Sequence, residues 1–97
     1  MEFTFDAELW VWEARLAWTF VTVPAEVSEE VRSLAGGRRP GFGSVRVHVT
    51  IGTTRWATSI FPDSGSGCYV LPVKRAIRKA ESLDTGDTTT LTLEPAP

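Results

Sequence analysis

Hydrophobic and polar residues alternate along several short segments of the chain, and this period of two is typical of strands that are buried on one face. In residues 44–51, valine and isoleucine take the odd positions, while Arg46, His48 and Thr50 lie between them. The same alternation predicts a first strand over residues 3–11. Further strands, for a total of roughly six, are expected over residues 15–23, 54–61, 68–71 and 88–94.

Two other segments have apolar residues at helical spacing, and each follows a strand that ends at a proline. The first begins after Pro24, stops at Gly36–Gly37, and has apolar residues at Val27, Val31, Leu34 and Ala35. The second begins after Pro72 and has apolar residues at Val73, Ala76, Ile77, Ala80 and Leu83. We therefore expect two short helices.

The two helical segments belong to similar units, in which a strand, a proline, a helix, a Ser-Leu pair and a glycine-containing turn follow one another. The units lie about 48 residues apart, a period at which internal duplication should be tested. They would form half-repeats near residues 16–52 and 68–94 of a single domain, residues 1–97. Chance similarity is the alternative, because helices that open on a proline are common. Together these patterns predict a mainly β fold: a small closed six-stranded β-barrel of the double-split type, with two short helices.

The aromatic residues add large apolar surfaces to this small domain, which has four tryptophans and five phenylalanines. Trp10 and Trp12 fall on the opposite parity from the other apolar residues of the first strand. We expect both indoles to be buried. The alternative is that they lie on a surface, or line a small-molecule pocket at the mouth of the barrel.

Charge and cysteine content restrict the function classes. Ten Lys and Arg against twelve Asp and Glu give a net charge of -2, the wrong sign for a dedicated binder of nucleic acid or anionic membranes. The lone cysteine, Cys68, cannot form an internal disulfide, which fits a reducing compartment. No segment has the pattern of a signal peptide or the length of a membrane span. We therefore expect a cytoplasmic protein that binds neither membranes nor, as its main task, nucleic acid.

The segment YVLPVKRAIRKAESLDTGD (residues 69–87), with WTFVTVP, GSVRVHVTIGTTRWATSIFP and LTLE, resembles a family of small bacterial and archaeal domains of unknown function. Members of that family occur alone or beside proteins linked to bacteriocin protection. The resemblance implies a small closed β-barrel and no known activity. The same segment is similar to the swapped-hairpin motif of AbrB- and MazE-like transcription factors, which dimerise and bind DNA. The present chain differs from those factors because it carries two such units and is acidic overall.

Basic residues after Pro72, with two arginines in the loop after the first helix, could form a patch for a phosphate-bearing ligand: Lys74, Arg75, Arg78, Lys79, Arg38 and Arg39. The alternative is the solvated face of an amphipathic helix. That alternative is favoured because no aromatic residue lies between these charges in the sequence. Proteins that bind single-stranded nucleic acid do have aromatic residues among their basic residues.

Other candidates for chemistry are weaker. His48 is the only histidine, so it has no second histidine for a metal and no motif-borne nucleophile to activate. Cys68 has no neighbouring base in the sequence. Asp63, Asp84 and Asp87 lie in predicted turns, where aspartate commonly bonds to the backbone. No catalytic residue, metal or cofactor is therefore predicted.

The sequence thus favours a non-enzymatic binding module for a partner protein or a small ligand. The alternative is a DNA-binding or antitoxin-like transcriptional regulator, and a small enzyme is a third hypothesis. We expect a monomer, because the two units would complete the barrel within one chain. A weak dimer through Trp10 and Trp12 is the alternative.

Overall fold

The computed structural model describes residues 1–13, 18–35 and 43–96, which form seven strands and two helices. The strands are β1 (Phe3–Glu8), β2 (Trp10–Trp12), β3 (Trp18–Thr22), β4 (Val45–Ile51), β5 (Thr54–Pro62), β6 (Tyr69–Pro72) and β7 (Thr88–Pro95). The helices are α1 (Ala25–Ala35) and α2 (Arg75–Ala80). The prediction of a mainly β fold with two short helices is confirmed for this part of the chain.

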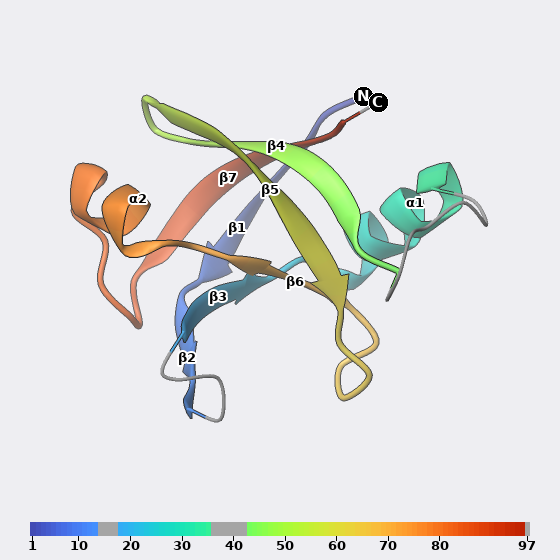
Figure 1. Cartoon of the computed structure of the whole chain (residues 1–97), viewed down its shortest axis with the longest axis horizontal. Coiled ribbons are helices and arrows are strands. Elements are labelled where there is room, and N and C mark those ends of the chain that lie inside the picture. Colours follow the sequence, from blue (N-terminus) through green and yellow to red (C-terminus); the bar gives the residue numbers. More distant parts are fainter. Residues whose placement is uncertain (14–17, 36–42, 97) are drawn as a thin grey trace.

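The strands of the described residues form one sheet in the order β1-β7-β4-β5-β6-β3-β2, and every paired neighbour is antiparallel. The sheet is strongly curved, with α1 and α2 at its opposite sides (Figure 1). Its two end strands, β1 and β2, form no ladder with each other. The sheet is therefore an open half-barrel, and the prediction of a closed six-stranded barrel is wrong.

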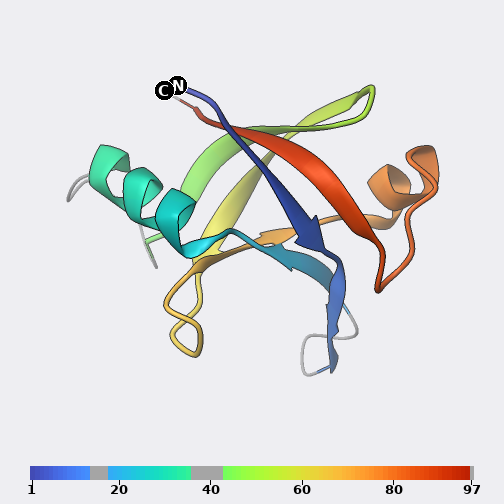
Figure 2. The same cartoon turned by 180° about the vertical axis from the view of Figure 1, so that it is seen from behind.

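The seventh strand arises because the predicted first strand is interrupted at Leu9. The Leu9 N–H donates to the Asp87 carbonyl at 2.9 Å, and the Leu9 carbonyl accepts the Gly86 N–H at 2.8 Å. Before Leu9 the chain pairs with β7, and after it the chain pairs with β3. Leu9 itself is fully buried. The chain thus passes from one part of the sheet to another between β1 and β2, and Figure 2 shows this bend between the two blue strands from behind.

The hydrophobic core lies on the concave face of the sheet and follows the predicted alternation. Val47, Val49 and Ile51 of β4 are buried, and Val45 packs against them as a partly buried residue. Trp10 and Trp12 are half-buried. They lie beside Phe20 and Trp18 on the other face of the sheet, as the register of β2 with β3 requires.

The helix α1 follows Pro24 as predicted, and its first turn is bonded to the sheet. The buried Ser28 donates its hydroxyl to the Val23 carbonyl and accepts the Tyr69 N–H, both at 3.0 Å. Val31 is buried as predicted, but Leu34, on the same predicted apolar face, is 53% exposed. The predicted stop at Gly36–Gly37 lies outside the described residues.

The helix α2 is shorter than the segment in which apolar residues recur at helical spacing. It ends at Ala80, and Ser82 has a positive φ of 55°, which the helix cannot continue through. Ile77 and Leu83 pack against the core as partly buried residues, whereas Ala76 and Ala80 are exposed. Neither α1 nor α2 has the length and apolar character that a membrane-crossing helix needs.

Candidate functional site

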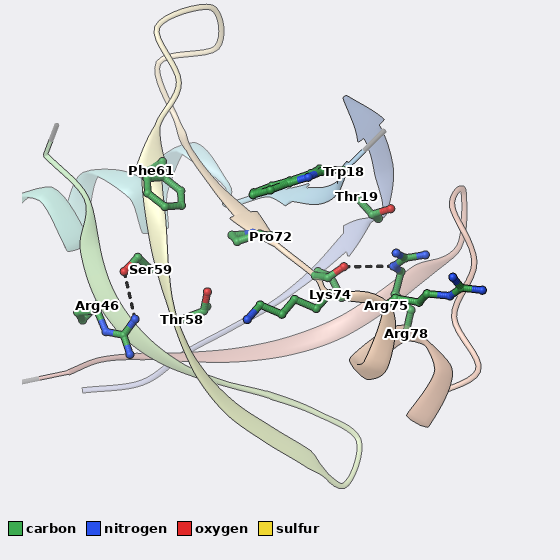
Figure 3. Close-up of a pocket in the computed structure, with 11 residues that line it drawn as sticks. Trp18, Thr19, Arg46, Thr58, Ser59, Phe61, Pro72, Lys74, Arg75 and Arg78 are labelled. Carbon is green, nitrogen blue, oxygen red and sulfur yellow. Dashed lines mark hydrogen bonds between the residues drawn. The ribbon is translucent and has the colours of Figure 1, made fainter. Parts of the chain in front are cut away.

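A groove of about 560 Å³ lies where the ends of β3 and β6 meet β5 and the start of α2. Its lining includes four cationic side chains, Arg46, Lys74, Arg75 and Arg78. Figure 3 shows the aromatic rings of Trp18 and Phe61 in its upper part, Lys74, Arg75 and Arg78 below and to the right of them, and Arg46 at the opposite, left end. The groove therefore combines positive charge with flat apolar surface.

Strand register brings the cations and the aromatic rings together. β3 and β6 are antiparallel, with Phe20 opposite Pro72. The ladder continues to the Val73 N–H, which donates to the Thr19 carbonyl at 2.9 Å. Lys74, the next residue after Val73, is consequently placed near Trp18, the residue before Thr19.

Arg78 is the most firmly positioned of the four cations. It is half-buried, and its Nε–H donates to the Val73 carbonyl at 3.1 Å, which leaves its terminal nitrogens for other acceptors. Across the groove, Arg46 lies opposite Ser59 in the β4–β5 ladder and donates weakly to the Ser59 hydroxyl at 3.4 Å. Lys74 and Arg75 are exposed.

The charges of the groove are not neutralised by carboxylates of the described residues. Among the described residues, the ion pairs lie outside the groove: Arg32 pairs with Glu29 at 3.7 Å, and Arg55 pairs with Glu94 at 3.2 Å. No described residue that lines the groove is acidic. Four cations without an acidic partner make a favourable site for an anion, since ionised hydrogen bonds are stronger than neutral ones.

The aromatic side of the groove continues into a second, smaller cavity. Trp18 is 49% exposed and Phe61 is 39% exposed, and both rings line the two cavities. The smaller cavity has a volume of about 190 Å³ and is otherwise lined by Trp12, Phe20, Pro62 and Val70. Apolar surface thus extends from the groove along the outer face of the sheet.

The structure brings together half of the predicted basic patch. Lys74, Arg75 and Arg78 line the groove, whereas Lys79 is exposed outside it. Arg38 and Arg39 lie outside the described residues. The interpretation that no aromatic residue interleaves these charges holds along the sequence but is wrong in space, because strand pairing adds Trp18 and Phe61.

Sequence reasoning also missed Arg46, which it assigned to the polar face of a strand. Arg46 does belong to that face, but the face curves toward the start of α2 and supplies a wall of the groove. The alternating pattern of residues 44–51 was the available signal. It identified an outward-facing arginine and contained nothing about what lies opposite.

The other residues that the sequence singled out lie in turns or in the sheet and do not line the groove. The Asp63 carboxylate accepts the Ser66 N–H and hydroxyl, and Asp87 accepts the Asp84 N–H at 2.8 Å, which confirms their use in turns. His48 lies opposite Ala57 and Glu94 in the sheet, away from the groove lining. Within residues 1–13, 18–35 and 43–96, no three metal-ligating side chains gather.

These features define a small half-barrel domain with a cationic, aromatic-walled groove. Residues 5–93 match the family described as a domain of unknown function (DUF1905), so the chain belongs to that family. This match confirms the resemblance to an uncharacterised domain family. No curated protein matches the chain.

Proposed function

We propose that this domain is a non-enzymatic binding module whose groove takes a small ligand with an anionic group. The observation behind the proposal is the convergence of four cationic side chains that have no carboxylate partner among the described residues. The net charge of the chain is -2, so this positive groove runs against the overall charge. Local concentration of opposite charge is how proteins attract small ions to one place.

The shape of the groove favours a small ligand over a partner protein. Its volume of about 560 Å³ falls within the range of roughly 300–1,000 Å³ that is usual for small-molecule sites. A concave site with apolar walls and a few polar groups can surround such a ligand. Protein partners more often dock on broader and flatter surfaces.

The composition of the groove supports binding without catalysis. Thr58 and Ser59 supply hydroxyls, but the described lining holds no histidine, cysteine or carboxylate that could take a proton from them. Its one amine, Lys74, is exposed, whereas lysines that act as bases are typically buried. A hydroxyl is a weak nucleophile without such a base. We also place the protein in the cytoplasm, which the lone Cys68 supports because no internal disulfide is possible.

The test is a titration with inorganic pyrophosphate, followed by NMR so that millimolar binding is detected and located. We expect amide shifts centred on residues 58–59 and 72–78. Lys74→Gln should weaken binding about fivefold, the effect of losing one charge contact of about 1 kcal/mol.

Lys79→Gln is the matched control. It makes the same chemical change at another exposed lysine of the same segment, but Lys79 does not line the groove. We expect it to leave pyrophosphate affinity within twofold of the original protein, given the small effects of remote exposed charges. Absence of pyrophosphate binding, or equal loss in the two variants, would overturn the proposed function.

A further inference from the structure

The aromatic side of the groove holds unusually exposed rings. Among the described residues, the large aromatic side chains that are exposed are Trp18 and Phe61, and both line the groove. Solvent exposure of such rings forfeits the free energy that burial would give. Contiguous exposed apolar surface is typical of binding sites.

Trp18 also packs against a neighbouring aromatic ring. Its ring packs on Phe20 with centroids 6.2 Å apart and planes at 31°. Phe20 is held in turn by Trp10, at 5.4 Å and 30°, and by Trp12, at 5.5 Å and 62°. The indole of Trp18 is therefore the outermost ring of a packed aromatic cluster, so it loses little conformational freedom when a flat ligand covers it.

A cationic end adjoins this aromatic platform. Pro72 lies between the rings of Trp18 and Phe61 and the side chain of Lys74, as Figure 3 shows. Arg75 and Arg78 extend the positive charge along the start of α2. A ligand that matches both ends carries a flat ring at one end and a phosphate at the other.

We propose that the ligand is a nucleotide, with its base stacked on Trp18 and its phosphate bound by Lys74, Arg75 and Arg78. This inference rests on the proposed function and names the ligand class for the same groove. Stacking on aromatic side chains suits any base, because every base has a π-face. Guanidinium groups suit phosphate because they donate parallel hydrogen bonds in a fixed geometry.

A free nucleotide fits the charge distribution better than a single strand of nucleic acid. Three of the four cations, Lys74, Arg75 and Arg78, gather at one end of the groove and Arg46 lies alone at the other. Proteins that bind single-stranded nucleic acid instead have cations along the whole path of the backbone. The chain also carries a net charge of -2, which opposes the approach of a polyanion.

The test compares four probes by calorimetry at fixed salt: AMP, ribose 5-phosphate, adenosine and a five-residue oligoadenylate. AMP should bind at least about fivefold more tightly than ribose 5-phosphate, which is the lower end of the effect of stacking one base. Adenosine should bind more weakly than AMP because it lacks the phosphate. The oligoadenylate should bind no more than about fivefold more tightly than AMP, the statistical factor expected when any one of its five nucleotide units occupies the site.

Variants of Trp18 separate stacking from general effects on the fold. Trp18→Ala should reduce AMP affinity to that of ribose 5-phosphate while leaving ribose 5-phosphate affinity unchanged. Trp18→Phe should keep most of the preference for AMP, because a ring remains. Leu34→Ala is the control, since it removes an exposed apolar side chain outside the groove and should change neither affinity.

Each contrary outcome has a distinct meaning. Equal affinities for AMP and ribose 5-phosphate would overturn the nucleotide inference while the anion-binding proposal stands. A preference for AMP that survives Trp18→Ala would also overturn it. Oligoadenylate binding more than tenfold tighter than AMP, with a steep dependence on salt, would replace the free nucleotide with a single strand. Failure of pyrophosphate to bind would remove the proposed function, and the nucleotide inference with it.

Discussion

Val23 and Val73 occupy matching places in the sheet. The Val23 N–H donates to the Tyr69 carbonyl, and the Val73 N–H donates to the Thr19 carbonyl, both at 2.9 Å. The two donors differ by 50 positions (23 and 73), and so do the two acceptors (19 and 69). β3 and β6 are thus joined at both ends by equivalent hydrogen bonds, which is the pattern of a local two-fold axis between them.

The helices keep the same spacing, because α1 begins at Ala25 and α2 at Arg75. The prolines differ by only 48 positions (24 and 72), so they are not equivalent in the structure. Pro24 directly precedes α1, whereas Pro72 is still paired within β6. Internal duplication remains a prediction. A shift of 50 residues, taken from the hydrogen bonds and the helix starts, aligns the two units better than the shift of 48 residues between the prolines.

If the two places are equivalent, Val23→Ala and Val73→Ala should have similar costs. Both side chains are buried in the core, so each substitution should lower the free energy of unfolding by about 2 kcal/mol. Urea unfolding followed by circular dichroism measures this. The control is Val45→Ala on β4, where the side chain is only partly buried and the cost should be smaller. A difference above about 1 kcal/mol between the two variants would argue against equivalence.

The individual β-strands could be predicted from the sequence, because each one depends on a local alternation of apolar and polar residues. Val47 and Val49 are buried and Arg46 is exposed, as alternation requires. The break at Leu9 could not be predicted, because the strand changes its partner there from β7 to β3, and both partners are far from Leu9 in the chain.

The groove could be predicted only in part for a similar reason. Lys74, Arg75 and Arg78 are neighbours in the sequence, so their charges were recognisable as a group. Trp18 and Phe61 reach the same place through pairing of β3 and β5 with β6, and no short segment contains that information. Local patterns therefore identified the cationic half of the site and missed its aromatic half.

The β4–β5 turn should be sensitive to an added methyl group at Gly52. Gly52 has a φ of 58°, and a Cβ there would lie 2.1 Å from Glu81 Oε1. The Glu81 carboxylate accepts a hydrogen bond from the Thr54 hydroxyl, and a shift of the carboxylate would disturb that bond. Gly52→Ala should lower the free energy of unfolding by about 2 kcal/mol, from backbone strain and from displacement of this carboxylate.

A double-mutant cycle separates the two causes. In the Glu81→Ala background the carboxylate is absent, so Gly52→Ala should cost only about 1 kcal/mol, the backbone contribution. Gly67→Ala is a control for that contribution, because Gly67 has a φ of 75° and its Cβ would meet no atom within 4 Å. An equal cost in the two backgrounds would show that Glu81 does not restrict this turn.

Two tryptophans differ in whether their indole N–H is bonded. Trp10 Nε1–H donates to the Thr22 hydroxyl at 3.0 Å, while the buried Nε1–H of Trp56 has no acceptor among the described residues. Trp10→Phe should therefore cost about 1–2 kcal/mol more than Trp56→Phe, since only the former loses a hydrogen bond. Thermal and urea unfolding of the two variants test this. A larger cost for Trp56→Phe would mean that its N–H is satisfied in solution.

The chain should be a monomer, because the two edge strands of its open sheet, β1 and β2, follow each other directly in the chain. β1 and β2 are separated by Leu9 alone, and β1 contacts β3 across the opening. The edges are thus partly covered by the chain itself, which removes the usual reason for pairing with a second copy. Trp10 and Trp12 are occupied by contacts with Phe20, so the outer aromatic face should support at most weak association.

Sedimentation equilibrium over a wide concentration range measures this directly. The expected result is a mass of 10.7 kDa that does not rise with concentration. Weak association at the highest concentrations should disappear in Trp18→Ala if the aromatic face causes it, because Trp18 is the exposed indole of that face. A mass that stays at twice the chain mass on dilution, with unfolding coupled to dissociation, would contradict the prediction. It would mean that a second copy covers the sheet edges that the single chain leaves open.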